Sequence, residues 1–143
     1  MVTQRSGIRV LLVDDLPILR EVLRSCLESV PNINVVGEAC NGEEAMSCMG
    51  KLQPQVVVMD INMPKMDGVT ATRLMTGQYP HVAVVGLSVT EDRYHKAAMK
   101  RAGAFEVMTK GKHDVDELCQ EIEKAAARTR FLFHAAKKAA LLN

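Results

Sequence analysis

Two short apolar runs in the sequence end directly in aspartate residues. The run 8–13 is followed by Asp14 and Asp15, and the run 56–59 is followed by Asp60. Continuous valine-rich runs of this length are typical of strands that are covered on both faces, as in a parallel sheet. If the two strands are neighbours, three carboxylates meet at one edge. Two charges about 4 Å apart repel by roughly 4 kcal/mol at an effective dielectric near 20, so the cluster must hold protons or a divalent cation.

Three further apolar runs alternate with segments of helical periodicity. The five predicted strands are residues 9–13, 34–39, 56–59, 82–87 and 105–108. Helices are predicted between them and after the last, namely from Pro17, from Asn41 to about Leu52, between Asp67 and Pro80, at about 91–102, and around 115–122. This alternation predicts an α/β fold, a doubly wound parallel sheet with helices on both faces.

Length and composition predict one soluble domain. The chain has 143 residues, of which 48% are hydrophobic and 24% charged, and its formal net charge of +1 gives no general attraction to nucleic acid or an acidic membrane. Neither an apolar leader in residues 1–7 nor an apolar run long enough for a membrane span is present, which favours the cytoplasm. The cysteines have no metal-binding spacing and are expected to be reduced core thiols: Cys26, Cys40, Cys48 and Cys119.

The ends of the last two predicted strands also carry polar side chains. Ser88 follows the fourth strand and Lys110 follows the fifth. In doubly wound sheets ligands bind outside the carboxyl ends of the strands, so three acids, a hydroxyl and an ammonium group are expected to face one crevice. Each also has a structural alternative. Asp14 or Asp15 would cap a helix, Ser88 would form a capping box with Glu91, and Lys110 would be a solvated lysine.

Four segments resemble the phosphoacceptor receiver domains of bacterial two-component response regulators. They are VLLVDDLPILR at 10–20, VVVMDINMPKMDG at 56–68, GLSVTED at 86–92 and AGAFEVMTKG at 102–111. The residues of these segments are similar to those of receivers that precede LuxR-type DNA-binding domains or form part of hybrid sensor kinases. The resemblance covers about residues 8–126. It implies a flavodoxin-like fold with five helices and strand order 2-1-3-4-5.

The resemblance also implies a Mg²⁺ site and a covalent intermediate. Asp60 is similar to the phosphoacceptor, whose carboxylate becomes an acyl phosphate that later hydrolyses. Asp15 and Asp60 would bind Mg²⁺ directly, Asp14 mainly through water, and Asn62 through its backbone carbonyl. Such a receiver catalyses its own phosphorylation and dephosphorylation but is not a turnover enzyme.

Further roles follow from the same resemblance. Lys110 and Ser88 would contact the phosphoryl group, as a point charge and a hydroxyl donor. The phosphodonor would be a sensor histidine kinase or a phosphotransfer protein, and small acyl phosphates would serve as well. Phosphorylation would then shift a two-state equilibrium of the face formed by the fourth helix, fifth strand and fifth helix, where an output domain or dimer partner would bind.

Two positions depart from the family pattern. Receivers often place an aromatic switch residue three positions before the lysine, where this chain has Val107. Phe105 would lie on the same side of the strand by its period of two and would partly replace that ring. Gly111 follows Lys110 where many receivers have proline, which predicts a more mobile loop.

The end of the chain differs in composition from the rest. Residues 1–127 are expected to form the receiver, whereas 128–143 carry basic and apolar side chains and no acid. This tail would extend the last helix, dock on a partner or a dimer mate, begin a linker to an absent domain, or fray. It is too short for a helix-turn-helix domain, so no DNA-reading element is expected in this chain.

Other function classes fit the motifs less well. A phosphatase of the haloacid dehalogenase type needs a second acid two residues after its aspartate nucleophile, where this chain has Asn62. A flavodoxin-like cofactor carrier would be repelled at its phosphate by Asp14 and Asp15. The remaining alternative is a receiver used as an interaction module without phosphorylation, which the absence of a switch aromatic at Val107 suggests.

Overall fold

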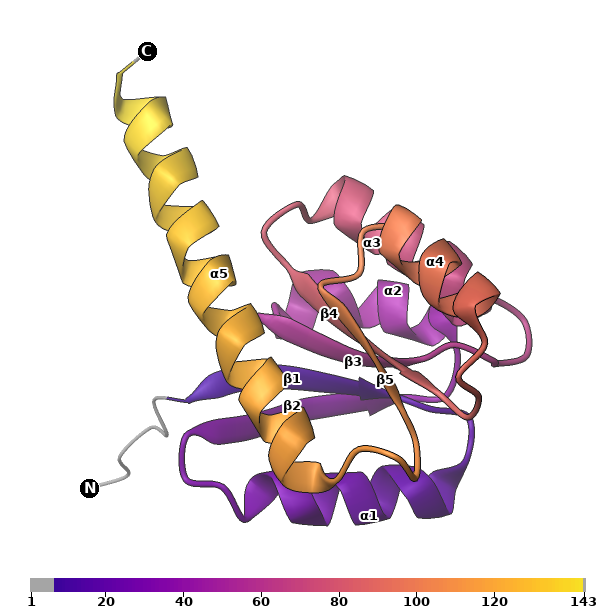
Figure 1. The fold of residues 1–143 in the computed structure, drawn as a ribbon. Helices are drawn as coiled ribbons and strands as arrows, with labels where there is room; N and C mark the ends of the chain where they lie inside the picture. The colour runs from indigo at the N-terminus through magenta and orange to yellow at the C-terminus, as the bar shows by residue number, and fades with distance from the viewer. Residues whose placement is uncertain (1–6, 143) are drawn as a thin grey trace.

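A computed structural model describes residues 7–142, so the opening of the chain, where no leader is expected, lies outside the described residues apart from Gly7. Five parallel strands form one sheet in the order β2-β1-β3-β4-β5 (Figure 1). Every strand begins and ends within one residue of its predicted bounds. The strands are β1 (Ile8–Val13), β2 (Ile33–Ala39), β3 (Val56–Asp60), β4 (Ala83–Ser88) and β5 (Glu106–Thr109). The predicted strand order is confirmed.

Five helices cover the two faces of this sheet. They are α1 (Pro17–Glu28), α2 (Gly42–Leu52), α3 (Gly68–Gln78), α4 (Arg93–Arg101) and α5 (Val115–Leu141). One core cluster joins the sheet to α1 and α5, and a second joins it to α2, α3 and α4 (Figure 1). The three central strands are buried along nearly their whole length, as their continuous apolar runs predict. The doubly wound architecture is thereby confirmed.

The helix starts decide two of the structural alternatives. Helix α1 begins at Pro17 without any side-chain cap, so neither aspartate after β1 caps it. Helix α4 begins at Arg93, two residues later than predicted, because the side chain of Asp92 accepts a hydrogen bond from the amide of Tyr94 at 2.8 Å. Ser88 is the last residue of β4 and lies outside that helix. The capping box of Ser88 with Glu91 is therefore wrong.

Phe105 does not lie on the same side as Val107. The ring of Phe105 packs against the core cluster of α1 and α5, whereas Val107 is buried in the cluster of α2, α3 and α4. Strand β5 begins only at Glu106, so the alternation of a strand does not extend back to Phe105. The prediction that Phe105 replaces the switch aromatic is wrong in its geometric premise.

Helix α5 is the longest element, with 27 residues, and it continues past residue 127 without interruption (Figure 1). Its far end projects beyond the sheet, and its large apolar side chains are exposed there, with 72% of Phe131 and 85% of Leu141 accessible. Among the helices of residues 7–142, none has the length and apolar character needed to cross a membrane. The four cysteines are free thiols, as predicted. Cys119 is buried in one core cluster and Cys48 packs half-buried against the other, whereas Cys26 and Cys40 are half-buried outside both.

Candidate functional site

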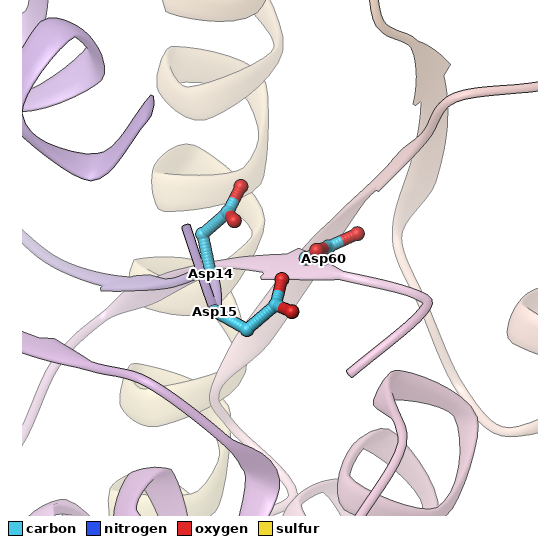
Figure 2. Close-up of side chains that lie close together, drawn as sticks. All are labelled: Asp14, Asp15 and Asp60. Carbon is cyan, nitrogen blue, oxygen red and sulfur yellow. The ribbon is translucent and has the colours of Figure 1, made fainter. Parts of the chain in front are cut away.

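The crevice at the carboxyl ends of the strands brings together the three predicted aspartates. Val13 pairs with Met59 in the register of β1 and β3. The next residue of each chain segment is an aspartate, so Asp14 and Asp60 are neighbours at the ends of adjacent strands. Asp14 and Asp60 are buried, with 2% and 5% of their surface exposed, and Asp15 is half-buried. One carboxylate oxygen from each lies within 4.8 Å of the others (Figure 2). The clustering expected from the two apolar runs is therefore present.

Lys110 lies in the same crevice. Its Nζ donates to Asp14 Oδ2 at 3.0 Å and lies 3.7 Å from Asp60 Oδ1, with 19% of the side chain exposed. It is not the solvated lysine of the structural alternative. When all four groups are ionised, three carboxylates and one ammonium leave two negative charges without a partner. A low-dielectric crevice makes that imbalance costly.

The carboxyl of Asp60 responds to this environment. Burial raises its pKa to about 6, Lys110 acts against the rise, and the negative charge of Asp14 adds to it. A backbone amide also contacts this group, because the N–H of Asn62 donates to Asp60 Oδ1 at 3.4 Å. Burial, more than the charge of its neighbours, therefore favours the protonated form of Asp60 in the absence of a cation.

A glycine lets the chain turn tightly behind Asp60. The amide of Gly68, the first residue of α3, donates to the carbonyl of Ile61 at 2.8 Å. A Cβ at this position would come within 2.2 Å of the carbonyl oxygen of Asp60, which no side chain tolerates. Asp67 then caps α3 by accepting from Thr70 N at 2.8 Å. The Asp-Gly pair therefore closes the loop that holds Asp60 at the mouth of the crevice.

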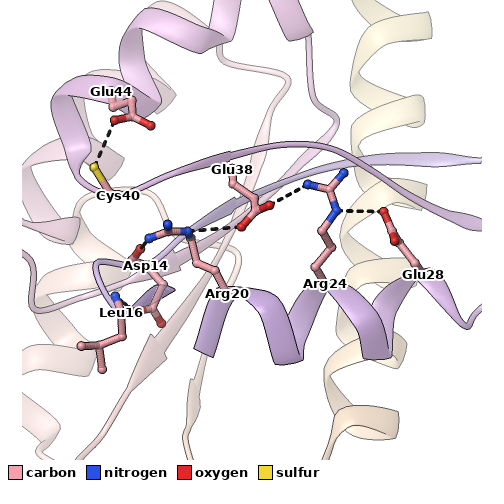
Figure 3. A network of polar contacts seen from close by, with 8 residues as sticks. All are labelled: Asp14, Leu16, Arg20, Arg24, Glu28, Glu38, Cys40 and Glu44. Atoms are coloured by element: carbon pink, nitrogen blue, oxygen red, sulfur yellow. Dashed lines mark hydrogen bonds and ion pairs between the residues drawn. The ribbon is translucent and has the colours of Figure 1, made fainter. Parts of the chain in front are cut away.

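The backbone of Asp14 is held by a residue that the sequence analysis did not single out. Arg20 Nη1 donates to the carbonyl oxygen of Asp14 at 2.5 Å, and its Nε contacts Glu38 at 3.2 Å (Figure 3). Asp14 Oδ1 also accepts the amide of Leu16 at 2.9 Å. Arg20 lies within the motif that ends at residue 20, and an acid near the end of the adjacent strand was the available signal for this contact.

Ser88 and Asn62 are the other two predicted site residues. Ser88 is 1% exposed, and its hydroxyl donates to the carbonyl of Thr90 at 2.8 Å while accepting the Thr90 amide at 3.2 Å. The hydroxyl is therefore occupied by a local turn. Asn62 lies beside Asp60 through its backbone amide, as described above.

The donor set fits a hard divalent cation. Carboxylate oxygens are the ligands that Mg²⁺ and Ca²⁺ prefer, whereas zinc and copper sites are rich in imidazole or thiolate. No histidine or cysteine belongs to this cluster among the described residues. A divalent cation would also neutralise the two negative charges that Lys110 leaves uncompensated.

Comparison with known proteins identifies the family. The model of the response regulator receiver domain matches residues 10–123. The chain belongs to this family. The receiver is 37% identical over 121 residues to a protein-glutamate methylesterase/protein-glutamine glutaminase of Methanosarcina mazei, with 82% of this chain but 34% of that protein covered. The receiver thus spans about a third of the length of that relative.

Solved structures agree with the family and with the fold. A LuxR-family two-component response regulator from Aurantimonas superimposes with a TM-score of 0.80 at 34% identity, covering 85% of the receiver and 86% of that chain. The complex of CheX and CheY with BeF3 and Mg²⁺ from Borrelia burgdorferi gives 0.75 at 25% identity, covering 82% and 87%. The expected similarity to receivers of LuxR-type regulators is confirmed.

Proposed function

We propose that this receiver accepts a phosphoryl group on the carboxylate of Asp60. The observation that carries the proposal is the single crevice in which Asp60 lies with two further carboxylates and the ammonium of Lys110, 3.7 Å from Asp60 Oδ1. A buried carboxylate with a raised pKa and one cationic neighbour is suited to act as a nucleophile once a cation balances the remaining charge. The family membership supports the same role.

We further propose Mg²⁺ as the bound cation. Asp15 and Asp60 would bind it directly, Asp14 mainly through water, and Asn62 through its backbone carbonyl. Bound there, the ion supplies positive charge to the phosphoryl oxygens. The burial of Asp14 and its bond to Lys110 Nζ at 3.0 Å support an indirect role for this carboxylate. The BeF3 and Mg²⁺ named for the CheX and CheY complex support this choice of ion by similarity.

The transfer is a displacement at phosphorus. An oxygen of Asp60 forms the new O–P bond while the P–N bond of a phosphohistidine donor breaks and the imidazole leaves. Lys110, which reaches both Asp14 and Asp60, would contact a phosphoryl oxygen and stabilise the charge that develops there. Hydrolysis of the acyl phosphate then restores the carboxylate and releases inorganic phosphate.

The phosphodonor is proposed to be a sensor histidine kinase or a phosphotransfer protein. Beside Lys110, a largely apolar hollow of about 180 Å³ lies between α1 and the loop after β5, and Val22 and Leu23 form part of its wall. Ile18 and Val22 of α1 are 75% and 52% exposed next to the crevice. A helix carrying the phosphohistidine would cover these side chains while it presents its phosphoryl group to Asp60.

The output is proposed to pass through Ser88. Its hydroxyl is bonded to the backbone of Thr90, so a new bond to a phosphoryl oxygen would release the start of the loop that leads to α4. Helix α4 is lightly anchored, with Met99 as its one fully buried residue. An output domain or dimer partner would read the change on the face formed by α4, β5 and α5.

Intact mass after incubation with Mg²⁺ and acetyl phosphate tests the proposal. We expect the wild type to gain one phosphoryl group and Asp60→Ala to gain none. Asp15→Asn keeps the proposed nucleophile Asp60 but loses a proposed Mg²⁺ ligand, so it should be phosphorylated far more slowly. A wild type that gains no phosphoryl group from acetyl phosphate or from a phosphorylated histidine kinase would instead support an interaction module that works without phosphorylation.

A further inference from the structure

We infer that His113 is a positioning residue for Lys110, holding the end of β5 through its ring nitrogen. The inference rests on the proposed function, since Lys110 matters only if the crevice accepts a phosphoryl group. It concerns a contact outside the acidic cluster. The amide of Thr109, the residue just before Lys110, donates to Nδ1 of His113 at 3.0 Å.

The position of β5 explains why such a contact is needed. β5 lies at the edge of the sheet, and within residues 7–142 the strand it pairs with is β4. The amide of Lys110 donates to the carbonyl of Ser88 at 2.7 Å, which ties the strand to β4. The amides of Val107 and Thr109 are bonded instead to side chains, those of Glu106 and His113. His113 thus supplies the acceptor that a further strand would provide.

The bond defines the state of the imidazole ring. Because Thr109 N–H is the donor, Nδ1 of His113 carries no proton, and in the neutral ring the proton is on Nε2. Nε2 lies 3.9 Å from Glu117 Oε2, so the N–H of the neutral ring is near a carboxylate. The backbone of the loop is closed at the same two residues, since the amide of His113 donates to the carbonyl of Thr109 at 3.2 Å.

The rest of the loop gives Lys110 little other support. Gly111 has a φ of +81°, and no atom of the described residues lies within 4 Å of where its Cβ would be, so that side of the loop is open. Lys112 forms an ion pair with Glu91, but both side chains are more than half exposed and such pairs hold weakly. The carbonyl of Thr109 accepts from the amides of Lys112 at 3.3 Å and His113 at 3.2 Å, and these backbone bonds shape the loop. The bond from Thr109 N–H to His113 Nδ1 is the side-chain contact that holds the amide on the outer side of this strand end, from which the Lys110 side chain reaches Asp14 and Asp60.

Two substitutions of His113 distinguish the effect of its hydrogen-bond acceptor from the effect of its ring size. His113→Phe keeps a ring but has no acceptor, whereas His113→Asn places an amide oxygen at about the position of Nδ1. We expect His113→Phe to lower the rate of phosphorylation by acetyl phosphate about threefold to tenfold, as one lost hydrogen bond would. His113→Asn should stay within about twofold of the wild type, as should Lys112→Ala, the control in the same loop.

A double mutant decides whether the effect passes through Lys110. In a Lys110→Ala background, His113→Phe should change the rate by less than about twofold, because the group that it positions is absent. An equal loss in both backgrounds would contradict the inference, as would a His113→Asn variant as slow as His113→Phe.

A second measurement does not depend on phosphorylation. The NMR signal of the Lys110 ammonium should move in His113→Phe and stay in His113→Asn, and the Thr109 amide should lose protection from hydrogen exchange only in the former. A wild type that is not phosphorylated would overturn the proposed function alone. Unchanged NMR signals in His113→Phe would overturn the role of His113 alone.

Discussion

The acidic crevice and the ionic network on α1 both consist of carboxylates and basic side chains, but they balance their charges differently. On α1, Arg20 and Arg24 share Glu38, and Arg24 also contacts Glu28 at 3.0 Å, so each acid faces a base (Figure 3). In the crevice, three carboxylates lie close together (Figure 2), and the ammonium of Lys110 contacts two of them, those of Asp14 and Asp60. The network on α1 is complete without a ligand. The crevice carries unbalanced negative charge, as an acidic cluster typical of receiver metal sites does, and that difference is why we propose cation binding there.

Removing the Lys110 ammonium should have the largest effect on phosphorylation. Lys110→Ala is expected to slow phosphorylation by acetyl phosphate about a hundredfold, because a preorganised charge at the developing phosphoryl oxygens is lost. The time course of intact mass at saturating Mg²⁺ measures this rate, with Lys112→Ala as the matched control. A Lys110→Ala rate within threefold of the wild type would remove Lys110 from the reaction.

Removing one acid from the crevice should stabilise the metal-free protein. Because the folded pKa of Asp60 is raised to about 6, the folded state binds more protons than the unfolded chain between about pH 4 and 6, and stability falls as pH rises through that window. The unfolding free energy of Asp60→Asn should therefore exceed that of the wild type by about 1–2 kcal/mol at pH 7.5, less than a full conversion of the shift because the folded protein relaxes around a buried charge.

Chemical denaturation in EDTA measures this difference. At pH 4.5 most of the advantage of Asp60→Asn should disappear, since the wild-type carboxyl is then protonated. An advantage that is the same at both pH values would contradict the charge imbalance and indicate a packing effect instead.

Binding of the proposed Mg²⁺ should stabilise the wild type. At ten times its dissociation constant, Mg²⁺ should raise the free energy of unfolding by about 1.4 kcal/mol through preferential binding to the folded state. Asp15→Asn, which removes one proposed ligand, should shift the required Mg²⁺ concentration upward. Equal stabilisation of the wild type and a variant that carries Asp15→Asn together with Asp60→Asn would place the ion elsewhere.

Disturbing the balanced network should matter least. Arg24→Gln removes both of its ion pairs, yet the Arg24 side chain is 39% exposed, so a loss of about 0.5–1 kcal/mol in unfolding free energy is expected. Its phosphorylation rate should equal that of the wild type. A rate loss near that of Lys110→Ala would mean that the network on α1 belongs to the site.

The sequence predicted those parts of the molecule that depend on continuous local patterns. The strands were predictable because buried parallel strands require uninterrupted apolar runs, and the convergence of Asp14 with Asp60 follows from the ends of two such runs. The side on which Phe105 packs was not predictable, because it depends on the residue at which β5 begins to pair with β4.

Side-chain contacts across loops could not be predicted from hydrophobic periodicity either. Ser88 and Asp92 both have side chains that cap helices well, and the structure alone identifies Asp92 as the cap of α4. His113 has no motif of its own, and its contact arises because β5 is an edge strand. Sequence patterns thus located the charged groups of the crevice but not the side chains that hold them in place.

Chemical trapping of the acyl phosphate tests the phosphoacceptor role of Asp60 most directly. After incubation with acetyl phosphate and Mg²⁺, borohydride reduces an aspartyl phosphate to homoserine, which peptide mass spectrometry locates in the sequence. We expect homoserine at position 60 alone, and none when EDTA replaces Mg²⁺. Homoserine at position 14 or 15, or a phosphoryl adduct that borohydride does not convert, would contradict Asp60 as the acceptor.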